Sequence, residues 1–286
     1  MWRLILSRIA LAAATVLAGG FISATLVRYA PGFGMDEQVL DPRLSSASIA
    51  AIRNEASADR AVISYYLGYL GKLLHGDLGV ARSMNRPVRE LLAERAGVSC
   101  GLAARGLLLA WLAAMAVVVA GHFLRLPGFS VCVTTASAGL LCLPAGAVAL
   151  LSILVNAPGC MPLAVILFPR VHRYLSNLAV AATRLPHMTA AKARGLSEAR
   201  ILFLHVVPVI RRELLALAGV SVGLAISAAI PVEALCGIPG LGQLAWQSAL
   251  ARDVPLLINL SVLIIAGVTL ANLVADLALR EQRLAQ

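Results

Sequence analysis

The chain has 286 residues, of which 60% are hydrophobic and only 13% are charged, and its net charge is +10. A soluble domain of this length could not bury so much apolar surface, so the composition excludes an ordinary soluble protein and indicates one that spans a bilayer. Nucleic-acid binding is disfavoured, because the arginines lie at segment ends and in loops rather than on one stripe and aromatic residues make up only 5%.

Six apolar segments are each long enough to cross the hydrocarbon core of a membrane, which takes about 20 helical residues. The first follows Arg3 and Arg8, as in a signal peptide, but its length and the lack of a small-residue cleavage site favour an uncleaved span. The fourth is interrupted by Pro169 and the basic residues after it. We therefore predict an all-α polytopic membrane protein with about six transmembrane helices, at 9–27, 98–121, 129–155, 163–183, 214–235 and 255–277.

The basic residues predict the orientation, because the cytoplasmic loops of membrane proteins carry an excess of lysine and arginine. With the N-terminus inside, the short outer loops hold Arg252 and little else. Both termini are then cytoplasmic, and the long first loop, 28–95, lies outside. The cytoplasmic side holds Arg3, Arg8, Arg125, the segment 184–212, Arg280 and Arg283.

The first loop is expected to contain short helices. Asp41-Pro42 is a typical helix start, with Ile49 and Ile52 following it on one face. Val62 and the tyrosines up to Leu70 recur at helical spacing, Gly76-Asp77-Leu78-Gly79 predicts a turn, and 87–95 predicts a third helix. With no internal repeat, we predict one permease domain over 1–286, made of a first span at 1–27, an extracytoplasmic loop at 28–96 and a five-span core at 97–286.

The chain lacks the usual residues for chemistry of its own. A phosphate-binding loop needs Gly-Lys-Ser/Thr, but Lys72 precedes leucine and Lys192 precedes alanine. The cysteines and histidines show no metal-ligand spacing, and no catalytic Ser/His/Asp or paired-carboxylate arrangement stands out. We therefore predict no enzymatic activity, no metal and no cofactor bound by this chain.

The segment 184–212 is a basic, polar interval between long apolar segments. Residues 187–194 can form two helical turns that end at Gly195, which suits the position just beyond a helix. Ser197 can cap a second helix, with Glu198 in its first turn, where the helix dipole favours an acidic side chain. An apolar stripe on that helix comprises Ile201, Leu202, His205 and Val206. The segment either docks into a groove of a cytoplasmic partner or is a surface hairpin that only connects two spans.

Basic residues inside apolar segments are costly unless they pair or face water. Arg105 either lines a translocation path or extends its charged end to the interface. Arg170 and Arg173, with His172, either line a cavity for anionic or carboxylate-bearing substrates or lie where Pro169 breaks the helix. We predict Arg105, Arg170 and Arg173 as translocation-path residues. In the fifth span, Gly219-x-x-x-Gly223 followed by Ser227 predicts a small face for close helix packing.

The stretch Thr189-Ala190-Ala191-x-x-x-Gly195 resembles the Glu-Ala-Ala-x-x-x-Gly coupling motif of type I ABC importer permeases. Other stretches resemble the dipeptide, oligopeptide and nickel permeases of this class, in order and over nearly the whole chain. These stretches are Arg28-Tyr-Ala-Pro31-Gly32, 69–79, Arg86-Pro87-Val88 with 90–92, 194–198 with His205, Glu233 with 237–242, Arg252-Asp253, and Asn272 with Asp276.

The resemblance implies a permease subunit of an ABC importer for peptides, nickel or a related small solute, in a bacterial inner membrane. It implies a second permease subunit in a heterodimer, two cytoplasmic ATPases that hold ATP and magnesium, and an extracytoplasmic binding protein. The residues it implies for ATPase coupling are Thr189, Ala190, Ala191, Lys192, Arg194, Gly195, Ser197 and Glu198. Those it implies for an outer vestibule are Glu233, Gly237, Pro239, Gly240 and Gly242.

The chain departs from the family pattern in three ways, and the shortened outer loop among them motivates a second hypothesis. Thr189 replaces the acidic residue, the proline expected near Glu213 is missing while Pro208 lies earlier, and the outer loop at 156–161 is much shorter than in the family. The alternative is an assembly or scaffold subunit that pairs with a more complete permease without shaping the passage of substrate. An ion-driven secondary transporter is disfavoured, because the expected intramembrane acids and inverted repeat are missing.

Overall fold

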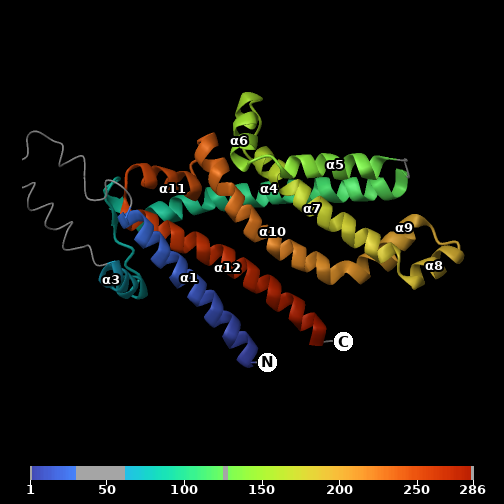
Figure 1. Cartoon of the computed structure of the whole chain (residues 1–286), viewed down its shortest axis with the longest axis horizontal. Coiled ribbons are helices and arrows are strands. Elements are labelled where there is room, and N and C mark those ends of the chain that lie inside the picture. The colour runs from blue at the N-terminus through green and yellow to red at the C-terminus, as the bar shows by residue number, and fades with distance from the viewer. Residues whose placement is uncertain (1, 30–61, 125–127, 285–286) are drawn as a thin grey trace, which may run out of the picture. The chain divides into compact units, whose positions relative to one another are not determined.

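The structure, a computed structural model, describes residues 2–29, 62–124 and 128–284. Its described elements are helices apart from one short hairpin (Figure 1), which confirms the predicted all-α class. The expectations for Pro31-Gly32, for the helix that begins at Asp41-Pro42 and for Arg125 fall outside the described residues.

The chain divides into two compact units, each made from two stretches of sequence. The first joins Met1–Arg95 to Leu244–Ala266, and the second joins Ala96–Gln243 to Gly267–Gln286. Three helices contribute residues to both units: α4 (Val88–Leu124), α11 (Leu241–Leu250) and α12 (Val254–Leu284). The prediction of one domain over 1–286, divided internally after residues 27 and 96, stays a prediction.

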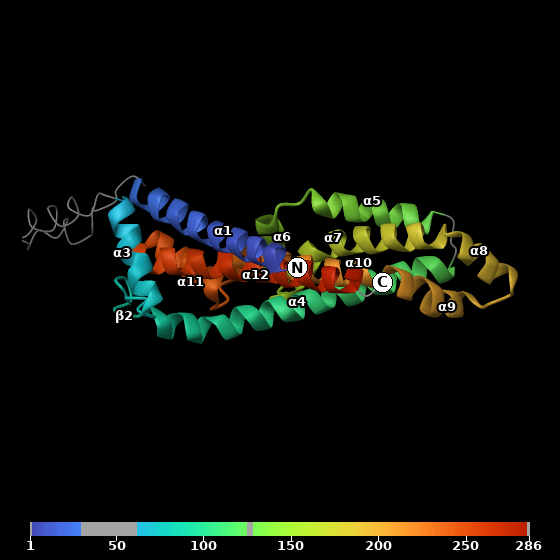
Figure 2. The ribbon, with the colours of Figure 1, turned by 90° about the horizontal axis from the view of Figure 1, so that it is seen from below.

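In the first unit, α1 (Trp2–Tyr29) and the first part of α12 pack against α3 (Val62–Leu74). Its buried core includes Ala24, Tyr66 and Ile258. Gly19 lets α1 approach α12 closely, because a Cβ there would meet the side chain of Ile265; Figure 1 and Figure 2 show the two helices side by side. The described elements of this unit not yet bounded are β1 (Val80–Ala81) and β2 (Arg86–Pro87).

The turn predicted at 76–79 follows α3, the helix that the tyrosine spacing predicted, and both predictions are confirmed. Gly76 and Gly79 each have a φ of +75°, a backbone conformation that favours glycine. The N–H of Gly79 donates to Oδ1 of Asp77 at 2.9 Å, which is the local side-chain bond typical of aspartate in turns. The antiparallel hairpin follows, with Val80 opposite Pro87.

The second unit is built around α7, which packs against α5, α6 and α10. Leu163 and Leu167 of α7 are fully buried in its core, and a Cβ at Gly106 of α4 would meet Leu163. Gly219 faces α12, because a Cβ there would meet Ala275, so the small face predicted in the fifth span packs within the chain. The helices of this unit not yet bounded are α5 (Phe129–Leu141), α6 (Ala145–Leu154), α7 (Cys160–Thr183) and α10 (Val207–Cys236).

Among the described residues, four helices are long and apolar enough to cross a membrane, at Leu6–Leu26, Val88–Gly121, Leu202–Cys236 and Val254–Asp276. They correspond to the first, second, fifth and sixth predicted spans, which supports a polytopic membrane protein. The helix α7, predicted as the fourth span, is not among them, and it carries Arg170 and Arg173.

The third predicted span, 129–155, is not one continuous helix. It forms α5 and α6, which together could make one span but are bent by 100°. The break lies at Pro144, which is extended with φ −60° and ψ 140°. Proline has no N–H for helical bonding and disfavours helical geometry in the residue before it, so the chain turns here.

Two further boundaries differ from the prediction. The separate helix expected at 87–95 is continuous with the second span in the 37-residue α4, because no proline interrupts the chain between them and the single Gly97 is tolerated in a helix. The outer loop between the fifth and sixth predicted spans contains α11, a helix that was not predicted from the sequence.

Candidate functional site

The basic segment 184–212 forms two short helices and a π-helical stretch at one end of the second unit, beyond α7 (Figure 1). The first helix, α8 (Pro186–Ala193), starts at a proline, which suits the first turn of a helix. Gly195 follows its end with a φ of +72°. The N–H of Leu196 donates to the carbonyl of Ala191 at 3.4 Å, in the pattern that closes helices at a left-handed glycine. The predicted glycine stop is confirmed.

The second helix, α9 (Glu198–Ile201), is capped as predicted. The N–H of Arg200 donates to Oγ of Ser197 at 3.4 Å, and Glu198 lies in the first turn. The π-helical stretch η2 (Leu202–Val206) joins α9 to α10. Pro208 has no N–H for the carbonyl of Leu204, so regular α-helical bonding is interrupted where the wider π turn lies.

The two short helices are fixed to the unit by one apolar face. Met188 of α8 and Ile201 of α9 are each at most 2% exposed. They pack with Ala182, Ala191, Leu202 and Val206. His205, predicted with this stripe, is only partly buried. The burial of these side chains therefore holds α8 against the end of α7, against α9 and against η2.

The opposite face of this segment is open. Ala190, Arg194, Gly195 and Ser197 are exposed, whereas Glu198 is half-buried. The backbone of Thr189 and Lys192 lies in α8, but their side chains are outside the described residues. The arrangement presents a thin, alanine-bearing helix with an arginine at its C-terminal end, a shape that can enter a groove on another protein.

A second site surrounds Glu233, near the end of α10. Its side chain is 1% exposed, and Oε2 accepts a hydrogen bond from the N–H of Gly242 at 2.6 Å. The neighbouring N–H of Leu241 donates to Oγ of Ser99 at 2.7 Å. The two side chains thus satisfy N–H groups at the start of α11, where a helix favours a negative charge.

The glycines predicted with Glu233 make room for this contact. Gly237 ends α10 with a φ of +66°. A Cβ at Gly240 would meet the Glu233 carboxyl group, and a Cβ at Gly242 would lie 2.6 Å from Cα of Ile230. The structure therefore brings together four predicted vestibule residues in one tight turn, with Pro239 exposed on it. The other carboxylate oxygen, Oε1, has no hydrogen-bond partner among the described residues.

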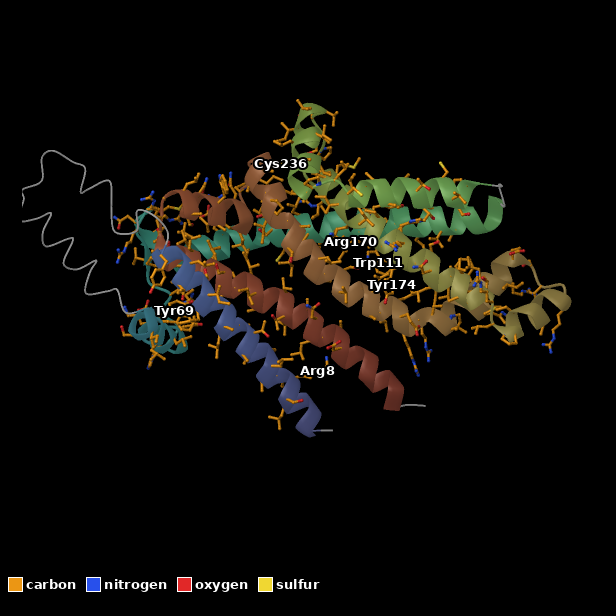
Figure 3. All side chains as sticks on the ribbon, viewed as in Figure 1. Arg8, Tyr69, Trp111, Arg170, Tyr174 and Cys236 are labelled. Carbon is orange, nitrogen blue, oxygen red and sulfur yellow. The ribbon has the colours of Figure 1, made fainter. Side chains whose placement is uncertain are left out.

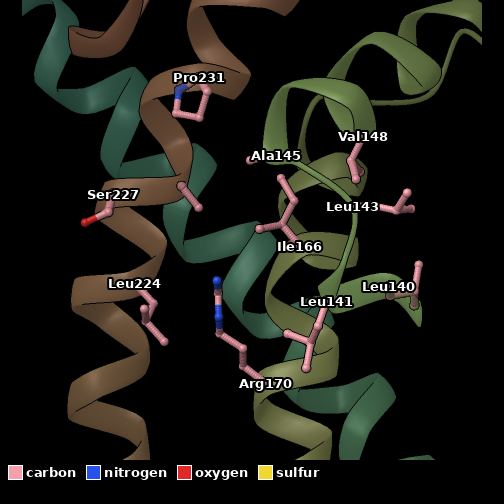
Figure 4. Close-up of a pocket in the computed structure, with 11 residues that line it drawn as sticks. Leu140, Leu141, Leu143, Ala145, Val148, Ile166, Arg170, Leu224, Ser227 and Pro231 are labelled. Carbon is pink, nitrogen blue, oxygen red and sulfur yellow. The ribbon is translucent and has the colours of Figure 1, made fainter. Parts of the chain in front are cut away.

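The three predicted translocation-path arginines do not share one cavity. Arg105 is exposed, and its Nε donates to the carbonyl of Gly101 on its own helix at 3.0 Å. Arg170 lines a cavity of about 270 Å³, which neither Arg105 nor Arg173 lines. Figure 3 labels Arg170 on the ribbon, and Figure 4 shows its side chain between α7 and α10. Of the three, only Arg170 lines this cavity, and a place for them in a translocation path stays a prediction.

His172 faces a different part of the second unit. It is buried, its Nδ1 lies 3.1 Å from Oγ of Ser137 on α5, and its ring stacks on Phe168. It borders a separate cavity of about 180 Å³. His172 and Arg170 therefore do not share a cavity, because residues two apart on a helix point in different directions.

In the first unit, a polar network was not predicted from the sequence. Asp253 is buried and accepts two hydrogen bonds from Ser83, from its N–H and its Oγ, both at 2.8 Å. It also accepts from the N–H of Leu256 at 3.2 Å, which caps the start of α12. An aspartate two residues before a proline is a recognisable sign of a helix start. Its hydrogen bond to Ser83, 170 residues away, could not be predicted from the sequence.

Asn259 makes the second set of bonds in this network. Its Oδ1 accepts from the hydroxyl of Tyr69 at 3.1 Å, and its Nδ2 donates to the carbonyl of Leu78 at 3.0 Å. The neighbouring Tyr66 donates to the carbonyl of Leu17 at 2.7 Å. Burial raises the pKa of Tyr66, so this hydroxyl keeps its proton at neutral pH. The network ties α3 and the turn after it to α12.

Comparison with known proteins gives one family. Residues 106–280 match the family described as binding-protein-dependent transport system inner membrane component. A Brucella ovis protein that bears the name of a peptide permease is 25% identical over 309 aligned residues, which cover 97% of each chain. The oligopeptide transport system permease protein OppB of Salmonella typhimurium is 25% identical over 265 residues, 85% of each chain. The di/tripeptide transport system permease protein DppB of Pseudomonas aeruginosa is 30% identical over 119 residues, which cover 42% of this chain and 34% of its own.

Proposed function

The chain belongs to the family of binding-protein-dependent transport system inner membrane components, and from this premise we propose that it is a permease subunit of an ATP-driven importer of peptides. It is a multi-pass protein of the inner membrane. Peptides are favoured over nickel as the solute, because the similar proteins are named for peptide transport.

We propose that α8 is the contact with a cytoplasmic ATPase. The observation that carries this is the division of its surface: Met188 and Ala191 anchor one face, while Ala190 and Arg194 are exposed on the other. An exposed helix with no anchor would move alone. An anchored one transmits its displacement to the helices beneath it.

The connection to the rest of the second unit supports the same role. The anchor residues pack against Ala182 near the end of α7, and η2 continues into α10 without a loop. A displacement of α8 would therefore act on α7 and α10, which pack against each other. In this proposal ATP and magnesium are bound by two partner ATPases, and work reaches this chain through the contact at α8.

The remaining partners would be a second permease subunit and an extracytoplasmic binding protein that delivers the peptide. The scaffold alternative is not favoured, because the similarity to the Brucella ovis protein, which is named as a peptide permease, covers 97% of both chains. A chain that only assembled a complex would need no ATPase contact or solute path.

The test is to purify the chain with the subunits that bind it and to reconstitute the complex in liposomes with ATP inside. Uptake of a radiolabelled tripeptide that requires ATP and the binding protein is the expected result. A complex that contains no ATPase, or uptake that persists without ATP, would overturn the proposal.

A further inference from the structure

The cavity beside Arg170 is an apolar space with one permanent positive charge in its wall. It lies among α5, α6, α7 and α10, and its volume is about 270 Å³ (Figure 4). Its other lining residues are apolar or small, among them Leu141, Ile166, Leu224, Ser227 and Pro231. An arginine cannot lose its charge at any physiological pH, so this wall is cationic whenever the protein is folded.

Within the described residues, no acidic side chain neutralises Arg170. The ion pairs found there include Arg86 with Glu90 and Glu94, far along the sequence. Glu233 on the facing helix α10 directs one oxygen to the N–H of Gly242. Arg170 is exposed, so its guanidinium is open to a ligand that enters the cavity.

The side chain of Arg170 cannot reach either end of α7. It lies ten residues after Cys160 and thirteen before Thr183, the limits of α7. At 1.5 Å per residue these are about 15 Å and about 20 Å along the axis, beyond the reach of the side chain.

We propose that this cavity receives a carboxylate group of the transported peptide and that the Arg170 guanidinium is the group that binds it. The planar guanidinium matches a carboxylate with two parallel N–H···O bonds, and such charge-assisted bonds are stronger than bonds between neutral groups. This inference rests on the proposed function, which supplies peptides as solutes.

The size of the cavity limits what it can hold. Pockets for whole small molecules are typically about 300 to 1,000 Å³, so about 270 Å³ takes one end of a peptide rather than all of it. Every unmodified peptide has a C-terminal carboxylate whatever its sequence, whereas acidic side chains are present only in some. Recognition of the terminus would therefore let one arginine serve many peptides, with the apolar wall accepting varied side chains.

The experiment measures equilibrium binding to the purified permease–ATPase complex with the binding protein omitted, so that its selectivity does not enter. The probes are trialanine, trialaninamide, and the amide of Ala-Glu-Ala, whose only carboxylate is in a side chain. Arg170→Gln, Arg170→Lys and the matched control Arg173→Gln are compared with the natural chain. Arg173 is exposed, as Arg170 is, and lies one turn further along α7, but it does not line the cavity.

The natural complex is expected to bind trialanine about tenfold or more tightly than trialaninamide, as a lost charge-assisted bond implies. Arg170→Gln should abolish this difference, Arg170→Lys should keep part of it, and Arg173→Gln should keep all of it. Binding of the Ala-Glu-Ala amide as tightly as trialanine would show that either carboxylate is accepted, and tighter binding of trialanine alone would assign the C-terminus. If Arg170→Gln does not assemble, Leu224→Glu supplies an internal carboxylate from α10 and should abolish the same difference.

Equal affinity for trialanine and its amide in the natural complex would overturn the inference, as would a difference that survives Arg170→Gln. ATP-driven uptake of trialanine by the complete transporter is measured in parallel. Uptake without dependence of binding on Arg170 would leave the proposed function standing and remove only this inference. Absence of ATP-driven uptake of any of the peptides would remove both.

Discussion

The buried carboxylate of Glu233 accepts a hydrogen bond from the backbone N–H of Gly242 at 2.6 Å, so the end of α10 and the start of α11 are fastened to each other. Gly240 lies beside the same carboxylate and leaves no room for a Cβ. This contact requires both an acidic side chain on α10 and glycines in the turn that follows it.

Replacing Glu233 with glutamine should destabilise the protein by about 1 kcal/mol, the difference between a hydrogen bond to a charged acceptor and one to a neutral acceptor. The amide keeps the size of the side chain but loses the negative charge that favours the N-terminus of α11. Thermal unfolding in detergent measures the change. Glu213→Gln is the matched control, because Glu213 is an exposed glutamate of the same helix. Equal unfolding temperatures for the two variants would contradict the role of the buried carboxylate.

Replacing Gly240 with alanine should lower the unfolding temperature, because the new methyl group would meet the Glu233 carboxyl and Oγ of Ser99. Overpacking of this kind typically costs about 1–3 kcal/mol. Gly139→Ala serves as control, since no atom lies within 4 Å of a Cβ at that helical position. Gly139→Ala should be neutral or slightly stabilising. A Gly240→Ala protein as stable as this control would show that the turn adjusts freely.

Replacing Gly195 with glutamate should abolish peptide uptake while leaving membrane insertion intact. The change puts a charged side chain on the exposed face beside α8 and strains a residue with a φ of +72°. Gly76→Glu is the matched control, because Gly76 has nearly the same φ, also lies in open space and belongs to the predicted outer loop. Uptake in proteoliposomes and the amount of chain in the membrane are measured. Loss of uptake in both variants alike would assign the effect to backbone strain rather than to the ATPase contact.

Replacing Ile201 with alanine should loosen the anchor of α8 and α9. Truncating a buried isoleucine costs about 2–5 kcal/mol, and Ile201 is 2% exposed. The expected result is ATP hydrolysis by the complex that no longer depends on peptide, with reduced uptake. Leu204→Ala, at a position 63% exposed, should change neither quantity. Normal coupling in the Ile201 variant would mean that α8 transmits displacement without this packing.

The bond between Ser83 and Asp253 is suited to a double-mutant cycle. Asp253→Ala removes the acceptor for three hydrogen bonds, whereas Ser83→Ala removes one donor and leaves its backbone N–H in place. Asp253→Ala should therefore be the more destabilising, and the pair should show a coupling energy of about 1 kcal/mol in thermal unfolding. Strictly additive effects would show that the hydroxyl contributes nothing to holding the hairpin.

Features set by neighbouring residues were predictable from the sequence. The glycine stop at Gly195 and the serine cap at Ser197 depend on backbone geometry within a few residues, and both were predicted correctly. The turn at 76–79 and the helix α3 before it follow from the same kind of local information. Charge and hydrophobicity gave four of the spans for the same reason, because each is a property of one continuous segment.

Features that depend on distant partners were not predictable. The sequence offers no sign that Asp253 meets Ser83, or that Gly219 lies against Ala275, because each pairing depends on how separate helices pack. Pro144 alone did not predict that the chain changes direction there, since many prolines are accommodated within membrane helices. The vestibule residues were named together only through a resemblance, and the structure supplies the reason in the bond from Gly242 to Glu233.

The helix from Leu202 to Cys236 runs 35 residues without a loop, from the segment around Gly195 to the turn around Glu233. At 1.5 Å per residue its length is about 50 Å. Each inserted or deleted residue would rotate one end against the other by about 100°, which would turn Glu233 away from α11 or the anchor face away from α8. The number of residues between these two sites is thus itself under constraint, and substitutions along this helix should be tolerated more readily than any change in its length.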